Sequence, residues 1–160
     1  KLGDVVTYFP SNTNLEFLAG SKINSYSPFS PFDPILCEFL HDISTVLINS
    51  VESKRYPDLM TFAFWCRKAN IKKIRKLFED GSIRLGIGLV FHITPSNVPV
   101  NFAFSFAFGL LSGNANIVRA PSKFFPQVNV ISEVIKTLFL QKKYAEIKSM
   151  TAIIKYEKKK

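Results

Sequence analysis

Residues 83–123 read IRLGIGLVFHITPSNVPVNFAFSFAFGLLSGNANIVRAPSK, and this stretch decides the fold. Its first part, from Ile83 to Ile93, is an almost unbroken apolar run, which is typical of a parallel strand covered on both faces. Thr94-Pro95-Ser96-Asn97 follows as a turn-rich loop, and an apolar helix is predicted over Val98–Leu111. Asn116–Arg119 has the pattern of a second short strand. The stretch therefore predicts a strand, a helix and a second parallel strand.

The sequence before residue 83 predicts two helices. Residues 1–32 hold turn-forming residues between short apolar pieces, and we expect an arm or loop there. Asp33-Pro34 is typical of a helix start, and the apolar spacing that follows predicts a first helix to about Ser50. A second helix is predicted from near Pro57 to Glu79, where Asp80-Gly81 ends it.

The sequence after residue 123 continues the alternation of helix and strand. Phe125-Pro126 begins another predicted helix, and Thr151–Tyr156 has the composition of a third strand. Alternation of this kind favours the α/β class, with a parallel sheet, flanking helices and right-handed crossovers.

Composition excludes several classes of function. A chain of 160 residues with 47% hydrophobic residues is long enough for one domain with a buried core. No run of 18 uninterrupted apolar residues is present and the chain does not open with a signal-peptide pattern, so we expect no membrane span and a cytoplasmic protein. Cys37 and Cys66 lie in apolar helical patterns without metal-ligand spacing, so we expect core cysteines and no metal site.

The net charge of +9 raises the question of nucleic-acid binding. One cluster of cations, from Arg67 to Lys76, falls in the second half of the predicted second helix, where positive charge complements the helix dipole and faces water. A second cluster, from Lys142 to Lys160, lies towards the C-terminus. We therefore expect solvated faces rather than a nucleic-acid interface.

The loop at residues 94–97 is the strongest candidate site, because α/β proteins bind ligands at the carboxyl ends of parallel strands. Asn97 stands at the predicted junction of loop and helix with its amide free, and a site role and a structural role are both open for it. Ser105 and Gly109 continue the same four-residue spacing along the helix, where small side chains favour close packing. His92, on the preceding strand, is expected to be a satisfied core residue.

A dinucleotide site of the usual kind is not present. Gly86 and Gly88 precede the core of the strand and no third glycine follows in register, so the GxGxxG fingerprint is missing. Arg119 and Lys123, just beyond the second strand, remain as two cations that could meet ribose hydroxyls or a phosphate. A dinucleotide would therefore have to be held by another route.

Residues 88–123, GLVFHITPSNVPVNFAFSFAFGLLSGNANIVRAPSK, closely resemble the acyl-CoA reductase of the bacterial bioluminescence fatty-acid reductase complex, a branch of the aldehyde dehydrogenase superfamily. The likeness extends more loosely upstream through Tyr56–Asn70 and downstream through Tyr156. It implies an atypical Rossmann domain that binds NAD(P) without the glycine fingerprint. It also implies an N-terminal fragment, in which residues 33–160 form an incomplete cofactor-binding domain and the nucleophilic cysteine lies beyond Lys160 in a catalytic domain.

The resemblance also implies roles for particular residues. Thr94-Pro95-Ser96-Asn97 resembles the superfamily's proline-asparagine loop, so Asn97 is expected to be catalytic, as the amide donor that holds the oxyanion. Arg119 resembles the position of the lysine that contacts the adenosine ribose. Lys123 stands where many NAD-preferring members carry a glutamate, which implies NADPH. The other cofactor-binding residues implied by the match are Thr94, Pro95, Ser96 and Ser122.

The activity implied by the resemblance is reduction of a fatty acyl thioester to a fatty aldehyde through an acyl-cysteine intermediate. The implied partners are acyl-transferase and acyl-protein synthetase subunits, and further copies of the same chain in a homo-oligomer. An alternative from another class stays open: a non-catalytic module that binds a nucleotide or a partner protein and has no catalytic half. A following domain with the cysteine would discriminate between the two.

Overall fold

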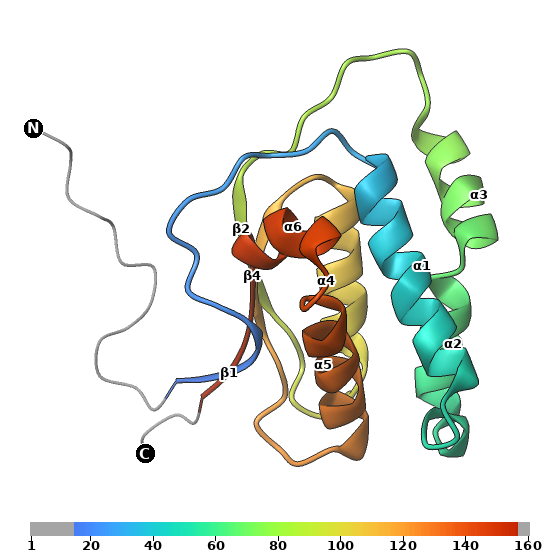
Figure 1. The fold of residues 1–160 in the computed structure, drawn as a ribbon, viewed down its shortest axis with the longest axis vertical. Coiled ribbons are helices and arrows are strands. Elements are labelled where there is room, and N and C mark those ends of the chain that lie inside the picture. Colours follow the sequence, from blue (N-terminus) through green and yellow to red (C-terminus); the bar gives the residue numbers. More distant parts are fainter. Residues whose placement is uncertain (1–14, 157–160) are drawn as a thin grey trace, which may run out of the picture.

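A computed structural model describes residues 15–156, and at its centre is a four-stranded sheet. The strands lie in the order β1-β4-β3-β2 (Figure 1) and are β1 (Glu16–Gly20), β2 (Leu89–Ile93), β3 (Ala115–Arg119) and β4 (Thr151–Lys155). Strands β2, β3 and β4 are parallel, whereas β1 pairs with β4 in the antiparallel sense. The predicted α/β class is confirmed, and the sheet is mixed rather than purely parallel.

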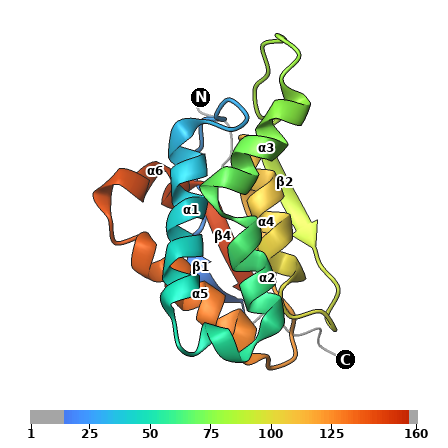
Figure 2. The same ribbon diagram turned by 90° about the vertical axis from the view of Figure 1, so that its right-hand side faces the viewer.

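The helices all lie on one face of this sheet, as Figure 1 shows. Helix α4 packs on β2 and β3, and α5 packs near β1, while α1, α2 and α3 form an outer layer that Figure 2 views from the front. Two short 3₁₀ turns, η1 (Ser53–Arg55) and η2 (Lys142–Tyr144), complete the elements. The helix bounds are α1 Pro34–Asn49, α2 Pro57–Trp65, α3 Lys68–Phe78, α4 Asn101–Leu111, α5 Pro126–Leu138 and α6 Ala145–Ser149.

Phe39 of α1 joins the layers of the main core. Its fully buried ring stacks on Phe139 at 5.4 Å between centroids, and it meets Tyr144 edge-on at 4.9 Å and Phe106 of α4 edge-on at 6.4 Å. Aromatic pairs in this geometry add about 0.5–1.5 kcal/mol each beyond their buried area. The predicted first helix is therefore confirmed, and it begins where expected because the Asp33 carboxylate accepts a hydrogen bond from the Ile35 N–H.

The predicted arm over residues 1–32 is wrong for Glu16–Gly20, because these residues form strand β1 at the edge of the sheet. Residues 1–14 lie outside the described part of the chain. After β1 the chain passes over the sheet face opposite the helices, where Ile23 is buried against Ile117 and Ile154. Residues 16–20 read EFLAG, which shows no alternation of apolar and polar residues, so the sequence carries no clear strand signal there.

The second predicted helix is in fact two, because the chain leaves helical geometry at Arg67 (φ −62°, ψ 140°). Ile71 is the buried residue of α3, and it lies five positions after Cys66, so on one continuous helix it would be rotated about 140° from the Cys66 face. The break removes this conflict. The Asn70 side-chain amide bridges the break, because it donates a 2.7 Å hydrogen bond to the Trp65 carbonyl at the end of α2.

Strand β2 is shorter and more exposed than predicted. It begins at Leu89, and residues 83–88 form no strand. It is also an edge strand, so the expectation that it is covered on both faces is wrong: Phe91 is 48% exposed and Ile93 is 70% exposed. Upstream of it lies an exposed apolar segment with Ile83, Leu85 and Ile87. This segment is called the arm, and it is distinct from the arm that was predicted over residues 1–32.

Helix α4 begins at Asn101, three residues later than predicted. Asn97 therefore lies in the preceding turn, and it does not share the helical stripe of Asn101, Ser105 and Gly109. Gly113 ends the helix with φ +79°, and the N–H groups of Gly113 and Asn114 donate to the carbonyls of Leu110 and Gly109. This pairing is a Schellman motif, which leads the chain directly into β3.

Candidate functional site

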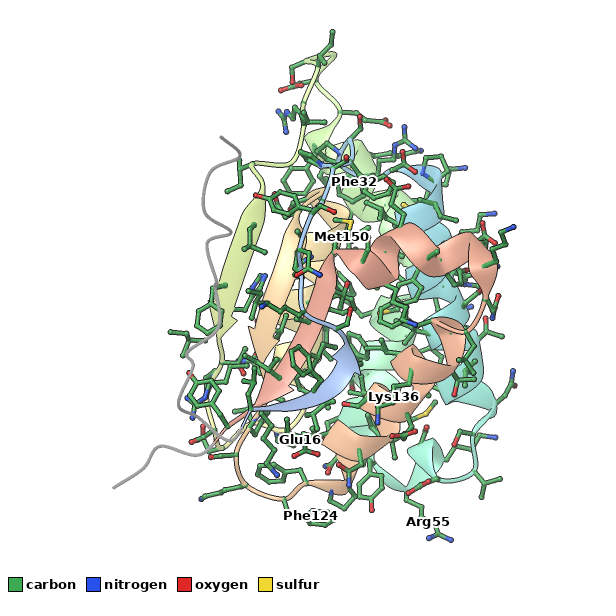
Figure 3. All side chains as sticks on the ribbon, turned by 60° about the vertical axis from the view of Figure 1, so that its left-hand side comes forward. Glu16, Phe32, Arg55, Phe124, Lys136 and Met150 are labelled. Atoms are coloured by element: carbon green, nitrogen blue, oxygen red, sulfur yellow. The ribbon has the colours of Figure 1, made fainter. Side chains whose placement is uncertain are left out.

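The candidate site lies where parallel strands β2 and β3 end side by side. Ile93 at the end of β2 is in register with Arg119 at the end of β3. The β2–α4 loop and the β3–α5 loop leave the sheet at this edge, at the lower end of the molecule in Figure 1. Figure 3 shows Phe124 of the second loop at this same end. The predicted site residues thus belong to the end of β3 and to two adjoining loops.

Thr94 ties these two loops together. Its side chain is buried, and its hydroxyl donates a 2.8 Å hydrogen bond to the backbone carbonyl of Arg119. The single hydroxyl proton is used in this bond, so only acceptor capacity remains for a ligand. The structure therefore gives Thr94 an internal role, and its cofactor-binding role stays a prediction.

Pro95, Ser96 and Asn97 are exposed at the turn that follows. Within residues 15–156 the Asn97 side-chain amide has no hydrogen-bond partner. A neutral N–H donor that is not engaged by the protein is available to a ligand oxygen. The assignment of these three residues to a site stays a prediction, but their chemistry and exposure are suited to it.

Arg119 is the most unusual residue of this edge. Its guanidinium carbon lies 4.6 Å from the centre of the Tyr156 ring, and its Nε atom is buried without a hydrogen-bond partner. Ser122 is half-buried and Lys123 is exposed in the loop that follows. A buried donor without an acceptor is costly, and a phosphate oxygen is the kind of acceptor that a guanidinium binds best. The residues present therefore fit an anionic part of a nucleotide.

Tyr156 was not recognised from the sequence as a site residue. It directly follows β4, whose Ile154 is in register with Arg119, so it reaches the same edge from the neighbouring parallel strand. The available signal was its position at the carboxyl end of the third predicted strand. A tyrosine one residue beyond an apolar strand resembles an ordinary core residue, and the sequence does not distinguish the two.

His92 belongs to a structural network rather than to the edge. Its Nε2 lies 2.9 Å from Oδ1 of Asn116 on β3, and the Asn116 amide donates to the Asn114 carbonyl at 2.7 Å. Since Oδ1 can only accept, Nε2 carries the proton. A Cβ on Gly109 of α4 would collide with both side chains. The expectations of a satisfied His92 and a closely packed Gly109 are confirmed.

The two cysteines are unsuited to nucleophilic chemistry. Cys66 is fully buried, and burial strongly raises the pKa of its thiol. Burial also raises the pKa of the half-buried Cys37, whose sulfur donates to the Phe32 carbonyl. A thiolate is the reactive form of cysteine, so both thiols are core groups, as predicted.

Other parts of the described chain offer no second centre of this kind. A hollow of about 580 Å³ lies between the C-terminal ends of α3 and α4 and the segment before α1, where Phe32, Phe78 and Phe108 contribute to its lining. None of the sequence-predicted site residues lines it. Among residues 15–156, no group of three His, Cys, Asp or Glu side chains could hold a metal ion.

The membrane and charge predictions concern the helices. No helix between residues 15 and 156 is long and apolar enough to cross a membrane. The cations of α3, namely Lys68, Lys72, Lys73, Arg75 and Lys76, are all exposed, as the sequence predicted.

Comparison with known proteins connects this site to a family. The sequence model of the acyl-CoA reductase (LuxC) family matches residues 65–160, which is more than half of the chain and includes both loops of the candidate site. A search of curated proteins and a search of solved structures found no match. The matched segment contains β2, α4, β3, α5 and β4. The chain therefore belongs to the acyl-CoA reductase (LuxC) family.

Proposed function

We propose that residues 33–160, together with β1, form part of the cofactor-binding domain of an NADPH-dependent fatty acyl-CoA reductase of the aldehyde dehydrogenase type. The observation that carries this proposal is the hydrogen bond from Thr94 to Arg119, which joins the ends of β2 and β3. It joins the loop that carries the unpartnered Asn97 amide to the end of β3, where Arg119 lies and from which the loop with Lys123 begins. The edge formed in this way is where parallel α/β sheets bind nucleotides.

Arg119, Ser122 and Lys123 would hold the adenosine end of the cofactor. The buried Nε of Arg119 without an acceptor supports an anionic ligand, and the exposed ammonium of Lys123 adds a second positive charge in the same loop. A 2′-phosphate satisfies both groups better than a 2′-hydroxyl does, because charged hydrogen bonds are about twice as strong as neutral ones. This arrangement favours NADPH over NADH. When bound, the nicotinamide would supply the hydride for the reduction.

Asn97 would act on the acyl group. As a thiolate attacks the thioester carbonyl, negative charge develops on the carbonyl oxygen, and the free amide N–H can donate to it. Pro95 and Ser96 hold the turn that presents the amide to solvent.

The attacking thiolate would come from outside residues 15–156, since Cys37 and Cys66 are held as core thiols. The external cysteine thiolate displaces the CoA thiolate to form an acyl-cysteine. Reduction of its carbonyl carbon then expels the cysteine thiolate again and leaves the fatty aldehyde. In this proposal residues 15–156 contribute binding and oxyanion stabilisation, and the nucleophile would come from a catalytic domain outside them.

The working protein would be a cytoplasmic homo-oligomer, in complex with the subunits that deliver the acyl group. The arm supports self-association: Ile83, Leu85 and Ile87 alternate along an extended segment and are at least 61% exposed. Replacing these three residues by serine should lower the association constant in sedimentation experiments by at least tenfold. The control is Leu140→Ser, which alters an exposed leucine elsewhere. Equal association of both variants would contradict the proposal.

The test of the cofactor assignment is titration of the chain with NADPH and with NADH. We expect tighter binding of NADPH, because each phosphate contact with a cation is worth a charged hydrogen bond. Lys123→Glu should reverse the preference, since a carboxylate repels the 2′-phosphate and accepts from the 2′-hydroxyl. Lys148→Glu makes the same charge change on α6, which lies just before the amino end of β4 and so away from the carboxyl edge of the sheet, and should leave the preference unaltered. Equal effects of the two variants would refute NADPH specificity at this loop.

A further inference from the structure

Arg119 and Tyr156 form a pair on the face of the sheet that the helices leave uncovered. Arg119 is in register with Ile154 of β4, and Tyr156 lies two residues further along that strand direction. Side chains alternate along a strand, so Ile117, Arg119, Ile154 and Tyr156 share one face. The buried cluster of Ile117 and Ile154, against which Tyr156 packs, is on this face. The pair therefore continues that cluster to the carboxyl edge.

The contact fixes a side chain that would otherwise be mobile. Arginine has several rotatable bonds, and ordering it costs up to about 2 kcal/mol of rotamer entropy. Thr94 holds only the Arg119 backbone carbonyl. The guanidinium itself lies 4.6 Å from the Tyr156 ring centre, within the range of a cation–π interaction. No charged side chain between residues 15 and 156 forms a salt bridge with Arg119.

The same contact leaves hydrogen-bond donors of the guanidinium without an acceptor. An aromatic face attracts the positive charge but accepts its N–H groups poorly, and the buried Nε has no partner. A salt bridge would hold the guanidinium as firmly and would occupy those N–H groups with carboxylate oxygens. The tyrosine therefore orders the arginine while its hydrogen-bond donors stay free for a ligand.

We propose that Tyr156 is a positioning residue that holds the Arg119 guanidinium in place for the 2′-phosphate of the nucleotide, and so sets the preference for the phosphorylated cofactor. This inference rests on the proposed function of the edge. Tyr156 acts through Arg119 and need not touch the ligand itself. The aromatic face, rather than the hydroxyl, is the part that acts.

The test is calorimetric titration of the chain with 2′,5′-ADP and with 5′-AMP, which differ only in the 2′-phosphate. In Tyr156→Leu the side chain stays apolar but the aromatic face is lost. We expect binding of 2′,5′-ADP to weaken roughly 2- to 30-fold, the range that corresponds to a cation–π interaction, while 5′-AMP binding stays within about twofold. Tyr156→Phe keeps the ring and should behave as the wild type with both probes.

The outcomes separate this inference from the proposed function. If Arg119→Ala weakens 2′,5′-ADP binding selectively and Tyr156→Leu does not, the positioning role is refuted and the proposed site stands. Equal losses for both probes in Tyr156→Leu would also refute it, because a merely structural tyrosine would disturb the whole edge. If Arg119→Ala has no selective effect, the proposed site itself fails. Circular dichroism checks folding, and Tyr156→Phe provides a folded reference if Tyr156→Leu unfolds.

Discussion

Strands β2 and β3 have the same length and lie in register, yet their surroundings differ. Strand β3 lies between β4 and β2, with α4 on one face and Ile23 against the other, and four of its five residues are buried. Strand β2 lies at the edge, and its Phe91 and Ile93 are largely exposed on the face opposite the helices. The comparison teaches that a run of apolar residues identifies a strand, whereas its neighbours decide how deeply it is buried.

The largest expected effect is on the free energy of unfolding, when isoleucine is replaced by alanine once on each strand. Ile117 of β3 and Ile93 of β2 point to the same face, with exposures of 3% and 70%. Ile117→Ala should lower the free energy of unfolding by about 2–5 kcal/mol, because it leaves a cavity in a buried cluster. Ile93→Ala should change it by less than about 0.5 kcal/mol. Urea denaturation measures both, and similar losses would show that β2 is covered in solution.

Helices and central strands were predictable because their signals are local. Asp33-Pro34 marks the start of α1 through a side-chain cap, and the apolar runs that became β3 and β4 are bounded by turn residues. The break at Arg67 and the exposure of β2 depend on what packs against the chain. Such tertiary information is not contained in the spacing of one segment.

The candidate site was predictable to a similar extent. Asn97 and Lys123 follow strands and Arg119 ends one, and a rule about parallel sheets is enough to bring them to one edge. The hydrogen bond from Thr94 and the stacking of Arg119 on Tyr156 join residues 25 and 37 positions apart, respectively. Pairings of this kind need the register of the sheet, and the sequence alone does not supply it.

A second prediction concerns the helix that joins these strands. On an exposed helix Gly→Ala stabilises by up to about 1 kcal/mol, but a Cβ at Gly109 would collide with Asn116 of β3 and His92 of β2. We expect Gly109→Ala to destabilise by about 1–3 kcal/mol through overpacking. Ser105→Ala, one turn earlier on α4, serves as the control and should be nearly neutral. A stabilised Gly109→Ala variant in thermal unfolding would contradict the close contact between α4 and the two strands.

The segments that lead into β4 and β2 also differ. The chain entering β4 is held by side-chain hydrogen bonds to α1, whereas the arm entering β2 is held through its backbone, by a hydrogen bond from the Gly86 N–H to the Phe29 carbonyl. Tyr144 is buried and its hydroxyl donates to Asp42 of α1, beside the Lys143 ammonium, which contacts Glu38 and Asp42. Burial raises the pKa of Tyr144 to about 12, and the hydrogen bond to Asp42 contributes. Tyr144→Phe should lower the free energy of unfolding by about 1–2 kcal/mol at neutral pH.

The pH dependence sharpens this third prediction. Because the folded state favours neutral Tyr144, its contribution is fully present below the ordinary tyrosine pKa of about 10 and is lost as the pH rises towards about 12. Unfolding curves from pH 8 to 12 should therefore show a decline that is shallower in Tyr144→Phe, although Lys143, whose pKa is also raised, retains part of it. Identical slopes in both proteins would exclude the hydrogen bond from Tyr144 to Asp42 as its source.

The smallest expected effect on the free energy of unfolding comes from substitutions in the arm. Ile83, Leu85 and Ile87 are 102%, 61% and 89% exposed, so a serine at each position removes almost no buried area. The triple variant should unfold within about 0.5 kcal/mol of the wild type in urea, measured at dilutions where both proteins are monomeric. The same variant is expected to weaken self-association. Unchanged monomer stability would therefore show that the three residues belong to an interface between chains and not to the core of one chain. A clear loss of monomer stability would instead mean that the side chains of the arm pack against their own chain.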